Sequence, residues 1–199
     1  MEHTRYEHLL IFGLIAAAVW FTVIYFLPGM LMSVYKKAIL VTGFGEGPVP
    51  INTLYTQPLA QFADPLHSPG SRLTVTGVNR DTIITLGWLD LSKGPLLLRV
   101  PDMDGRYYSV QLINPLKNIA FAYVGKRTSG TAAGEYAICG PDWEKNPPQG
   151  IPKITSPNKS LLLICRVLVF SGDDLPAAYN LSKQVQISQL ADITGGRGG

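Results

Sequence analysis

Histidine and cysteine, the side chains most used in metal and catalytic sites, are scarce in this chain. Two cysteines and three histidines occur among 199 residues. Beyond residue 8 the one histidine is His67, in a proline-rich loop, so a Ser-His-Asp triad there would depend on it. Asp102-Met103-Asp104-Gly105 resembles the start of a calcium loop but lacks the later ligands. The sequence therefore predicts no metal site, and it gives His67 little support as a catalytic residue.

Other signatures of enzymes and of nucleic-acid binders are also missing. The chain has no G-x-S-x-G nucleophile motif and no phosphate-binding glycine loop followed by Lys-Ser or Lys-Thr. Its net charge of +3 is mild, and its cations form no basic stripe with interleaved aromatics. We therefore expect no cofactor and no nucleic-acid partner.

Charged residues are absent from one long stretch, between Leu9 and Tyr35. Within this stretch Leu9–Leu27 is almost wholly apolar and would form roughly 28 Å of helix, close to the ~30 Å of a hydrocarbon core. Residues 1–35 are thus predicted to be a single transmembrane anchor in the lipid bilayer. Pro28-Gly29 predicts a helix break at the membrane surface.

A cleaved signal peptide is the competing interpretation of this segment. It would have a shorter apolar region and a small-x-small site after it, whereas the only alanine run, Ala16–Ala18, lies in the middle. The flanks do not decide the orientation, since Arg5 and the terminal amine stand on one side and Lys36 and Lys37 on the other.

The remainder of the chain divides into three parts. Residues 36–70 are rich in Gly, Pro and Thr and predict a linker, with a short helix over 36–41. Residues 71–191 predict one β-rich domain, and the glycine-rich residues 192–199 a flexible tail. Short apolar runs with turn residues between them predict an antiparallel β-sandwich or barrel-like domain. The runs cover residues 72–78, 82–89, 95–100, 106–113, 118–124, 135–139 and 160–170.

Turn and helix signals complete this pattern. Asp104-Gly105, between two apolar runs, predicts a hairpin turn. After Ser171, Asp173 or Asp174 is placed to cap a short C-terminal helix, and residues 186–190 predict a last strand.

Arg166 is the most unusual residue of the domain. The run 160–170 is apolar on both faces of a strand, which predicts a central, buried strand with Arg166 inside it. A buried Arg needs a partner, and Asp81 and Asp90 are the candidates for a structural ion pair. An anion-binding pocket and exposure at a strand end are the alternatives.

Further polar residues are ligand-binding candidates. Asn79-Arg80-Asp81-Thr82 suits a turn, but Arg80 and Asp81 are also candidates to line a ligand site at the sheet edge. Arg127, in Lys126-Arg127-Thr128, is a hairpin-tip residue or an anion contact. Cys139 and Cys165 both lie in apolar runs, so they are buried thiols or, in an oxidising compartment and on adjacent strands, a disulfide.

Several of these motifs together resemble the domain-of-unknown-function family 1254. The resemblance rests on residues 79–82, 88–95, 101–102, 105–109, 125–128, 140–143, 166 and 173–175, and it spans roughly residues 72–190. It implies a β-rich domain of bacterial origin that is exported or membrane-anchored, here at the inner membrane with a periplasmic domain. Cys139 and Cys165 depart from the glycines that it implies, which adds to the disulfide hypothesis.

The resemblance also implies a partner. Longer members resemble a fusion of this domain with a second β-rich domain of family 1214. The chain ends before such a domain, so we expect a separate, membrane-anchored, β-rich protein resembling family 1214 beside it. The leading hypothesis is therefore a periplasmic binding or assembly module. The alternative is a hydrolase-like enzyme whose site forms at the partner interface with Arg80, Asp81 and Arg127.

Overall fold

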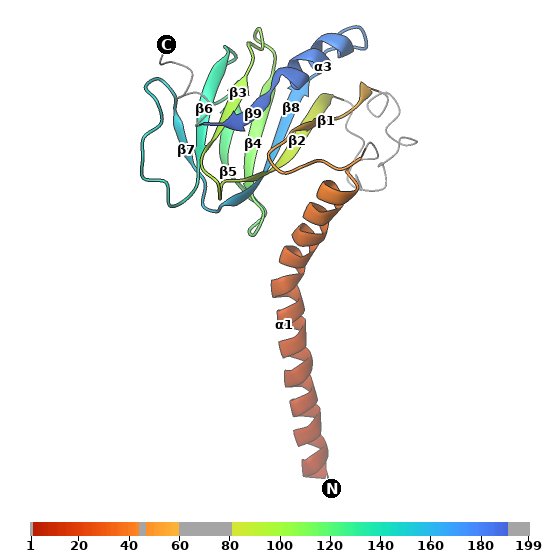
Figure 1. Ribbon diagram of the computed structural model, residues 1–199. Helices are drawn as coiled ribbons and strands as arrows, with labels where there is room; N and C mark the ends of the chain where they lie inside the picture. Colours follow the sequence, from red (N-terminus) through yellow and green to blue (C-terminus); the bar gives the residue numbers. More distant parts are fainter. Residues whose placement is uncertain (1, 44–46, 60–80, 191–199) are drawn as a thin grey trace.

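The computed structural model describes residues 2–43, 47–59 and 81–190 as a long helix joined to a β-sandwich (Figure 1). The helix α1, Glu2–Val41, contains the stretch Leu10–Val41, which is long and apolar enough to cross a membrane. The predicted break at Pro28-Gly29 is wrong, because α1 runs through Pro28. An interior proline costs a helix about 3 kcal/mol, which the helix-forming residues on both sides outweigh here.

Five strands form the first sheet, in the order β1-β2-β8-β4-β5, and every neighbouring pair is antiparallel. The strand β1 belongs to the segment predicted as a linker, so part of that segment joins the sheet. The strands are β1 (Tyr55–Thr56), β2 (Thr82–Asp90), β4 (Tyr108–Asn114), β5 (Ile119–Gly125) and β8 (Ser160–Leu168).

Four strands form the second sheet, in the order β7-β6-β3-β9, with β6 and β7 parallel and the other pairs antiparallel. A short helix, α3 (Leu175–Gln184), connects β8 to β9. The mainly β fold predicted from the sequence is thus confirmed. The strands are β3 (Leu96–Val100), β6 (Gly134–Cys139), β7 (Lys153–Thr155) and β9 (Gln186–Gln189).

Two local predictions have other outcomes. Asp104-Gly105 does form a tight turn with both φ angles positive, but β3 and β4 on either side of it lie in different sheets. The turn therefore carries the chain across the sandwich and does not close a hairpin. The predicted strand over residues 72–78, the tail 192–199 and His67 lie outside the described residues.

The main core fills the space between the sheets. It joins inward side chains of β2, β4 and β8 with those of β3 and β6, and Ala178 of α3 closes one side. Strand β8 is central in its sheet, as its two apolar faces predicted. Leu161, Leu163, Cys165 and Val167 face the core, whereas Leu162 and Ile164 belong to a cluster on the outer face.

The end of α1 covers part of this outer face. Ile39, 1% exposed, packs with Trp88 and Leu162, and Lys36 Nζ lies 3.3 Å from Ser160 Oγ and 5.3 Å from the centre of the Trp88 ring. We call the end of the sandwich that carries Asp90, Asn114 and Ser160 the α1 end. The opposite end carries Thr82, Tyr108 and Leu168 and is called the far end. Figure 1 shows α1 extending away from the sandwich past the α1 end.

Candidate functional site

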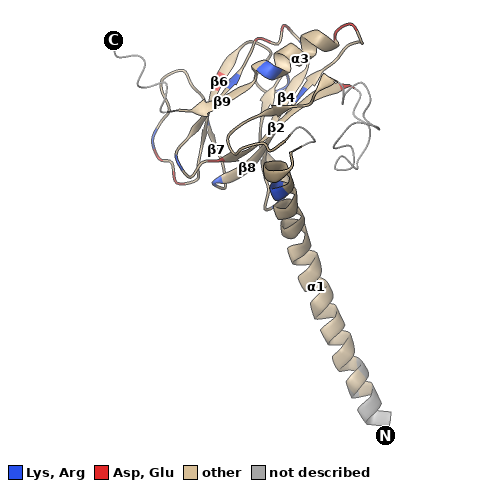
Figure 2. Ribbon diagram, turned by 45° about the vertical axis from the view of Figure 1, so that its right-hand side comes forward, with Lys and Arg blue, Asp and Glu red and all other residues tan. Residues whose placement is uncertain are grey.

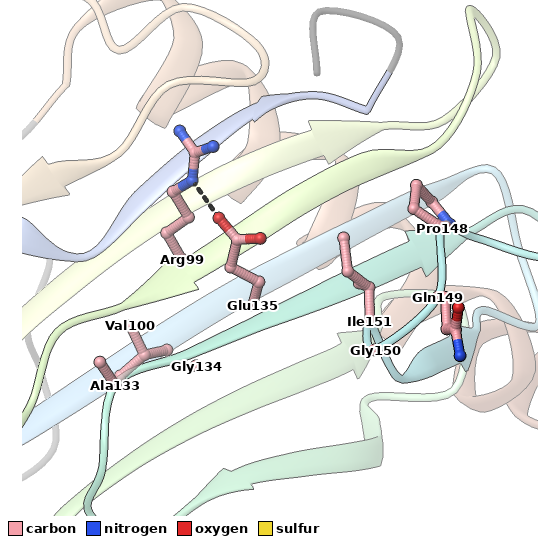
Figure 3. A pocket seen from close by; sticks show the side chains of 9 residues that line it. All are labelled: Arg99, Val100, Ala133, Gly134, Glu135, Pro148, Gln149, Gly150 and Ile151. Carbon is pink, nitrogen blue, oxygen red and sulfur yellow. Dashed lines mark hydrogen bonds and ion pairs between the residues drawn. The ribbon is translucent and has the colours of Figure 1, made fainter. Parts of the chain in front are cut away.

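A groove of about 540 Å³ opens on the outer face of the second sheet (Figure 3). Arg99 of β3 and Glu135 of β6 are paired in the sheet register, and their side chains meet in the groove. The loop before β7 forms the other wall with Pro148–Ile151. The groove is therefore built by two central strands of the sheet and one covering loop.

The two charges of the groove neutralise each other. Arg99 Nε donates to Glu135 Oε1 over 2.7 Å, and the two side chains are 44% and 40% exposed. Within the described part of the chain, Glu135 is the side chain that bonds to the Arg99 guanidinium (Figure 3). The lining contains no His, Cys, Ser or Thr. This arrangement suits the binding of a small polar group and offers no nucleophile.

A second candidate surface is the outward side of β5, which we call the β5 edge. Strand β5 ends the five-stranded sheet, so its backbone on that side pairs with no other described strand. Ile119 and Tyr123 are 60% and 51% exposed. Lys117 precedes the strand, Lys126-Arg127 follow it, and residues 116–127 include no acidic residue. The β5 edge is thus basic, partly apolar and open to strand addition.

The structure separates most of the residues predicted to line a ligand site. Arg80 lies outside the described residues. Asp81 and Arg127 are both at the far end, but β2 and β5 are three strand spacings apart, roughly 14 Å. Arg127 lies over the Tyr107 ring at 5.5 Å. The two residues therefore do not form one pocket.

Arg166 is half-buried on the outer face of the sheet, and its partner differs from the prediction. Its Nη1 donates to Gln111 Oε1 over 2.9 Å, and neither Asp81 nor Asp90 pairs with it. The register explains this, because Arg166 lies opposite Ile84 while Asp90 lies opposite Ser160. Six residues of strand, roughly 20 Å, separate those positions. Asp81 precedes Thr82, the partner of Leu168, and alternation directs it to the other face.

Asp90 instead belongs to the α1 end. Its carboxylate accepts a hydrogen bond from Ser92 N over 2.9 Å. Hydrogen bonding from the Ser92 side chain, helped by this backbone bond, holds the pKa of Asp90 below its ordinary value. The backbone of Asp90 is held by Asn52, whose Oδ1 accepts from Asp90 N over 2.8 Å. Asp90 thus fastens the segment before β1 to the sheet.

Cys139 and Cys165 are both free and buried. Cys165 lies in the core between the sheets, whereas Cys139 lies under the loop that covers the second sheet. Burial raises the pKa of Cys165 to about 12, and burial also raises the pKa of Cys139. The structure therefore agrees with buried thiols and does not bring the two residues together as a disulfide.

The buried ion pair of the domain involves residues that our search for site residues did not select. Arg106 and Asp174 meet at the far end with side chains 10% and 17% exposed. Arg106 Nη2 lies 2.6 Å from Asp174 Oδ1, and Nη1 donates both to Asp174 Oδ2 and to Leu168 O. Asp174 stands at the N-cap of α3 as expected, but its side chain makes no capping bond. The only signal in the sequence was that both residues lie in the motifs of the family resemblance.

Metal chemistry finds no support in residues 2–43, 47–59 and 81–190, where no group of three His, Cys, Asp or Glu side chains is placed to hold an ion.

Comparison with solved structures gives one similar fold and one weaker match. The VPA0106 protein of Vibrio parahaemolyticus matches with a TM-score of 0.61 at 24% identity, over 84% of this chain and 37% of that one. An uncharacterised protein of Burkholderia cenocepacia matches with a TM-score of 0.39 at 13% identity, over 71% of this chain and 36% of that one. This chain thus spans little more than a third of each of these proteins. No curated protein matches it.

A family model described as "Protein of unknown function (DUF1254)" matches residues 52–189. The match includes both sheets and begins at Asn52, the residue that binds the backbone of Asp90. Because it covers well over half of the chain, the protein belongs to the DUF1254 family.

Proposed function

We propose that this protein is an assembly module of the bacterial inner membrane, anchored by α1, with its sandwich in the periplasm. The module binds a second β-rich, membrane-anchored protein through the β5 edge. The single observation that carries the proposal is the edge itself, a seven-residue strand with basic residues just before and after it, which has a described partner on one side only.

The membrane placement is supported by α1. Its most apolar part is not buried against the sandwich, so these side chains need another apolar environment. A bilayer supplies that environment for a helix of this length. The periplasmic side of the membrane is taken from the family resemblance, because the flanking charges favour neither side.

The β5 edge supports strand addition in its backbone. Lys126 N donates to Tyr108 O, so residues 126, 124 and 122 bond toward β4. The amide group of Tyr123 therefore points outward, where a strand of another protein can pair with it. At Phe121 the register shifts, so the alternation of inward and outward amides holds for residues 122–126. Lys126 and Arg127 would attract a partner strand with an acidic flank.

The second protein is expected to resemble family 1214, because longer members of the family resemble a fusion of this domain with a domain of that kind. The Vibrio protein holds far more chain than the part that this one matches. Anchoring two such proteins in one membrane would raise their effective concentration and replace a covalent link between domains.

Crosslinking in native membranes tests this proposal. A photoreactive amino acid at Tyr123 of the full chain should trap one β-rich membrane protein, whereas the same group at the exposed Lys145 should not. Tyr123→Pro should abolish the complex, because proline removes an outward amide without touching the bonds to β4. Tyr123→Thr keeps the amide and should retain it. A complex that survives Tyr123→Pro, or equal crosslinking from both positions, would contradict the proposed edge.

The compartment has its own test. Alkaline phosphatase fused after residue 190 should be active, and a fluorescent protein that matures only in the cytoplasm should be dark at the same position. The opposite pair of results would place the sandwich in the cytoplasm and remove the periplasmic part of the proposal.

The alternative, an enzyme with Arg80, Asp81 and Arg127 at the partner interface, gains no support from the described residues. Asp81 and Arg127 are too far apart to act on one small group, and Arg80 lies outside the described residues. The binding module is therefore preferred.

A further inference from the structure

The turn between β4 and β5 carries exposed apolar side chains at the α1 end. Leu116 is 71% exposed and Ile119 is 60% exposed, with Lys117 and Asn118 between them. The turn is firmly built, because Leu116 N donates to Asn114 Oδ1 over 3.0 Å. Two exposed aliphatic residues on one tip give a small surface that an apolar partner can cover.

The strand register fixes the direction in which this turn points. Ile113 of β4 pairs with Leu162 near the start of β8, and Asn114 pairs with Ile119. The turn therefore lies at the same end of the sandwich as Ser160, which Lys36 of α1 contacts. Figure 1 shows this end of the sandwich facing the side along which α1 extends.

The length of the uncharged part of α1 determines where the α1 end of the sandwich lies relative to the membrane surface. From Leu9 to Tyr35 the helix measures roughly 40 Å, about the thickness of a bilayer with its headgroup layers. Lys36 therefore comes at the outer boundary of the headgroups, and so does the α1 end that touches it. Figure 2 shows basic residues on α1 where it reaches the sandwich.

The charges around the turn fit the same surface. Lys36, Lys37, Lys93 and Lys117 all belong to the α1 end. Asp90 keeps its negative charge at this end, with its carboxylate accepting a hydrogen bond from Ser92 N, and Asp142 is paired with Lys159 over 3.0 Å. A lysine near an anionic membrane surface favours contact by about fivefold. Apolar side chains beside lysines are the pattern of a segment that lies in the membrane interface.

We propose that the β4–β5 turn is a second membrane contact, in which Leu116 and Ile119 enter the headgroup region of the bilayer that holds α1, and Lys117 binds anionic headgroups. This inference rests on the proposed anchoring by α1. The contact would fix the sandwich upright on the membrane and present the β5 edge sideways, toward a partner in the same membrane.

The test uses the full chain in vesicles of phosphatidylcholine and phosphatidylglycerol, with an environment-sensitive dye on one introduced cysteine. The positions are Leu116→Cys at the turn, Ala132→Cys at the far end and Val19→Cys within α1. Lipids with a spin label near the headgroup should quench the dye at 116 and not at 132, and deeply spin-labelled lipids should quench it at 19. Removing the anionic lipid, or adding Lys117→Glu, should reduce the quenching at 116 severalfold.

Two results would overturn the inference in distinguishable ways. Quenching at 19 with none at 116 would leave the anchor in place and remove the second contact. Absence of quenching at both 19 and 116 would remove the anchoring itself, and the membrane contact with it. Equal quenching at 116 and 132 would show that the sandwich has no preferred orientation, which also contradicts the proposal.

Discussion

Arg106 and Asp174 are 68 residues apart in the chain and form a two-armed ion pair at the far end of the sandwich. The pair joins the start of β4 to the start of α3, and Arg106 also bonds to Leu168 O at the end of β8. Asp174 Oδ2 further accepts from Phe170 N over 2.9 Å. One pair thus holds the closing segment of the domain to the sheet.

Removal of one partner should therefore be costly. Arg106→Met is expected to lower the free energy of unfolding by about 3–5 kcal/mol, because it leaves Asp174 shielded and unpaired. The measurement is urea unfolding of the full chain in detergent. A loss below about 1 kcal/mol would show that solvent replaces the guanidinium without cost.

Acid should weaken the same contact. The hydrogen bonds from Arg106 hold the pKa of Asp174 at about 2, below the ordinary 3.8. A depressed pKa stabilises the fold fully above the unfolded value, and this contribution is lost as the pH falls through the folded value. The stability difference between wild type and Asp174→Asn should therefore be largest above about pH 4 and shrink toward about pH 2. Unfolding curves over this range test it, and a constant difference would contradict it.

Replacing Arg166 should cost far less stability than replacing Arg106. Arg166 is half-buried beside an apolar cluster, and its described side-chain partner is the neutral Gln111. Arg166→Met is therefore expected to change the free energy of unfolding by less than about 1 kcal/mol in either direction. It is also the matched control for Arg106→Met, since both changes replace Arg by Met within the first sheet region. A loss of several kcal/mol would restore the idea of a buried ion pair at Arg166.

Arg106 and Arg166 show which features of the fold could be predicted from the sequence and which could not. Alternating apolar runs predicted most strands and the central place of β8. The residues of a single strand are enough to show which of its two faces are apolar. Partners across the sandwich depend on register and on strand order. Asp90 seemed available to Arg166 until the pairing of Asp90 with Ser160 placed it at the other end. Arg106 gave no local signal, since its turn position looks exposed in the sequence and is covered by Phe170 and Asp174 from a distant part of the chain.

The cysteines lead to a redox prediction. Burial raises the pKa of Cys165 to about 12, and both thiols are free in the structure. Neither thiol should react with a maleimide in the folded chain, and both should react in denaturant. Reducing agent should leave the thermal midpoint unchanged. A midpoint that falls on reduction would support the disulfide that the sequence left open.

Gly87 provides a test of the segment that crosses the outer face before β1. A Cβ on Gly87 would lie 2.3 Å from Thr53 O and 2.8 Å from Leu54 Cδ2, so the crossing segment would have to move. Asn52 holds this segment down through its contacts with Asp90 and Trp88 O. Gly87→Ala should therefore lower stability by about 1–3 kcal/mol.

The matched control for that change is Gly172→Ala, because a Cβ on Gly172 meets no atom within 4 Å. It should leave stability unchanged or raise it slightly, since alanine restricts the unfolded chain. Asn52→Ala should produce a loss that overlaps with that of Gly87→Ala, because both changes release the same segment. Fully additive losses would mean that the segment is held independently at the two places and that Gly87 serves only its own strand.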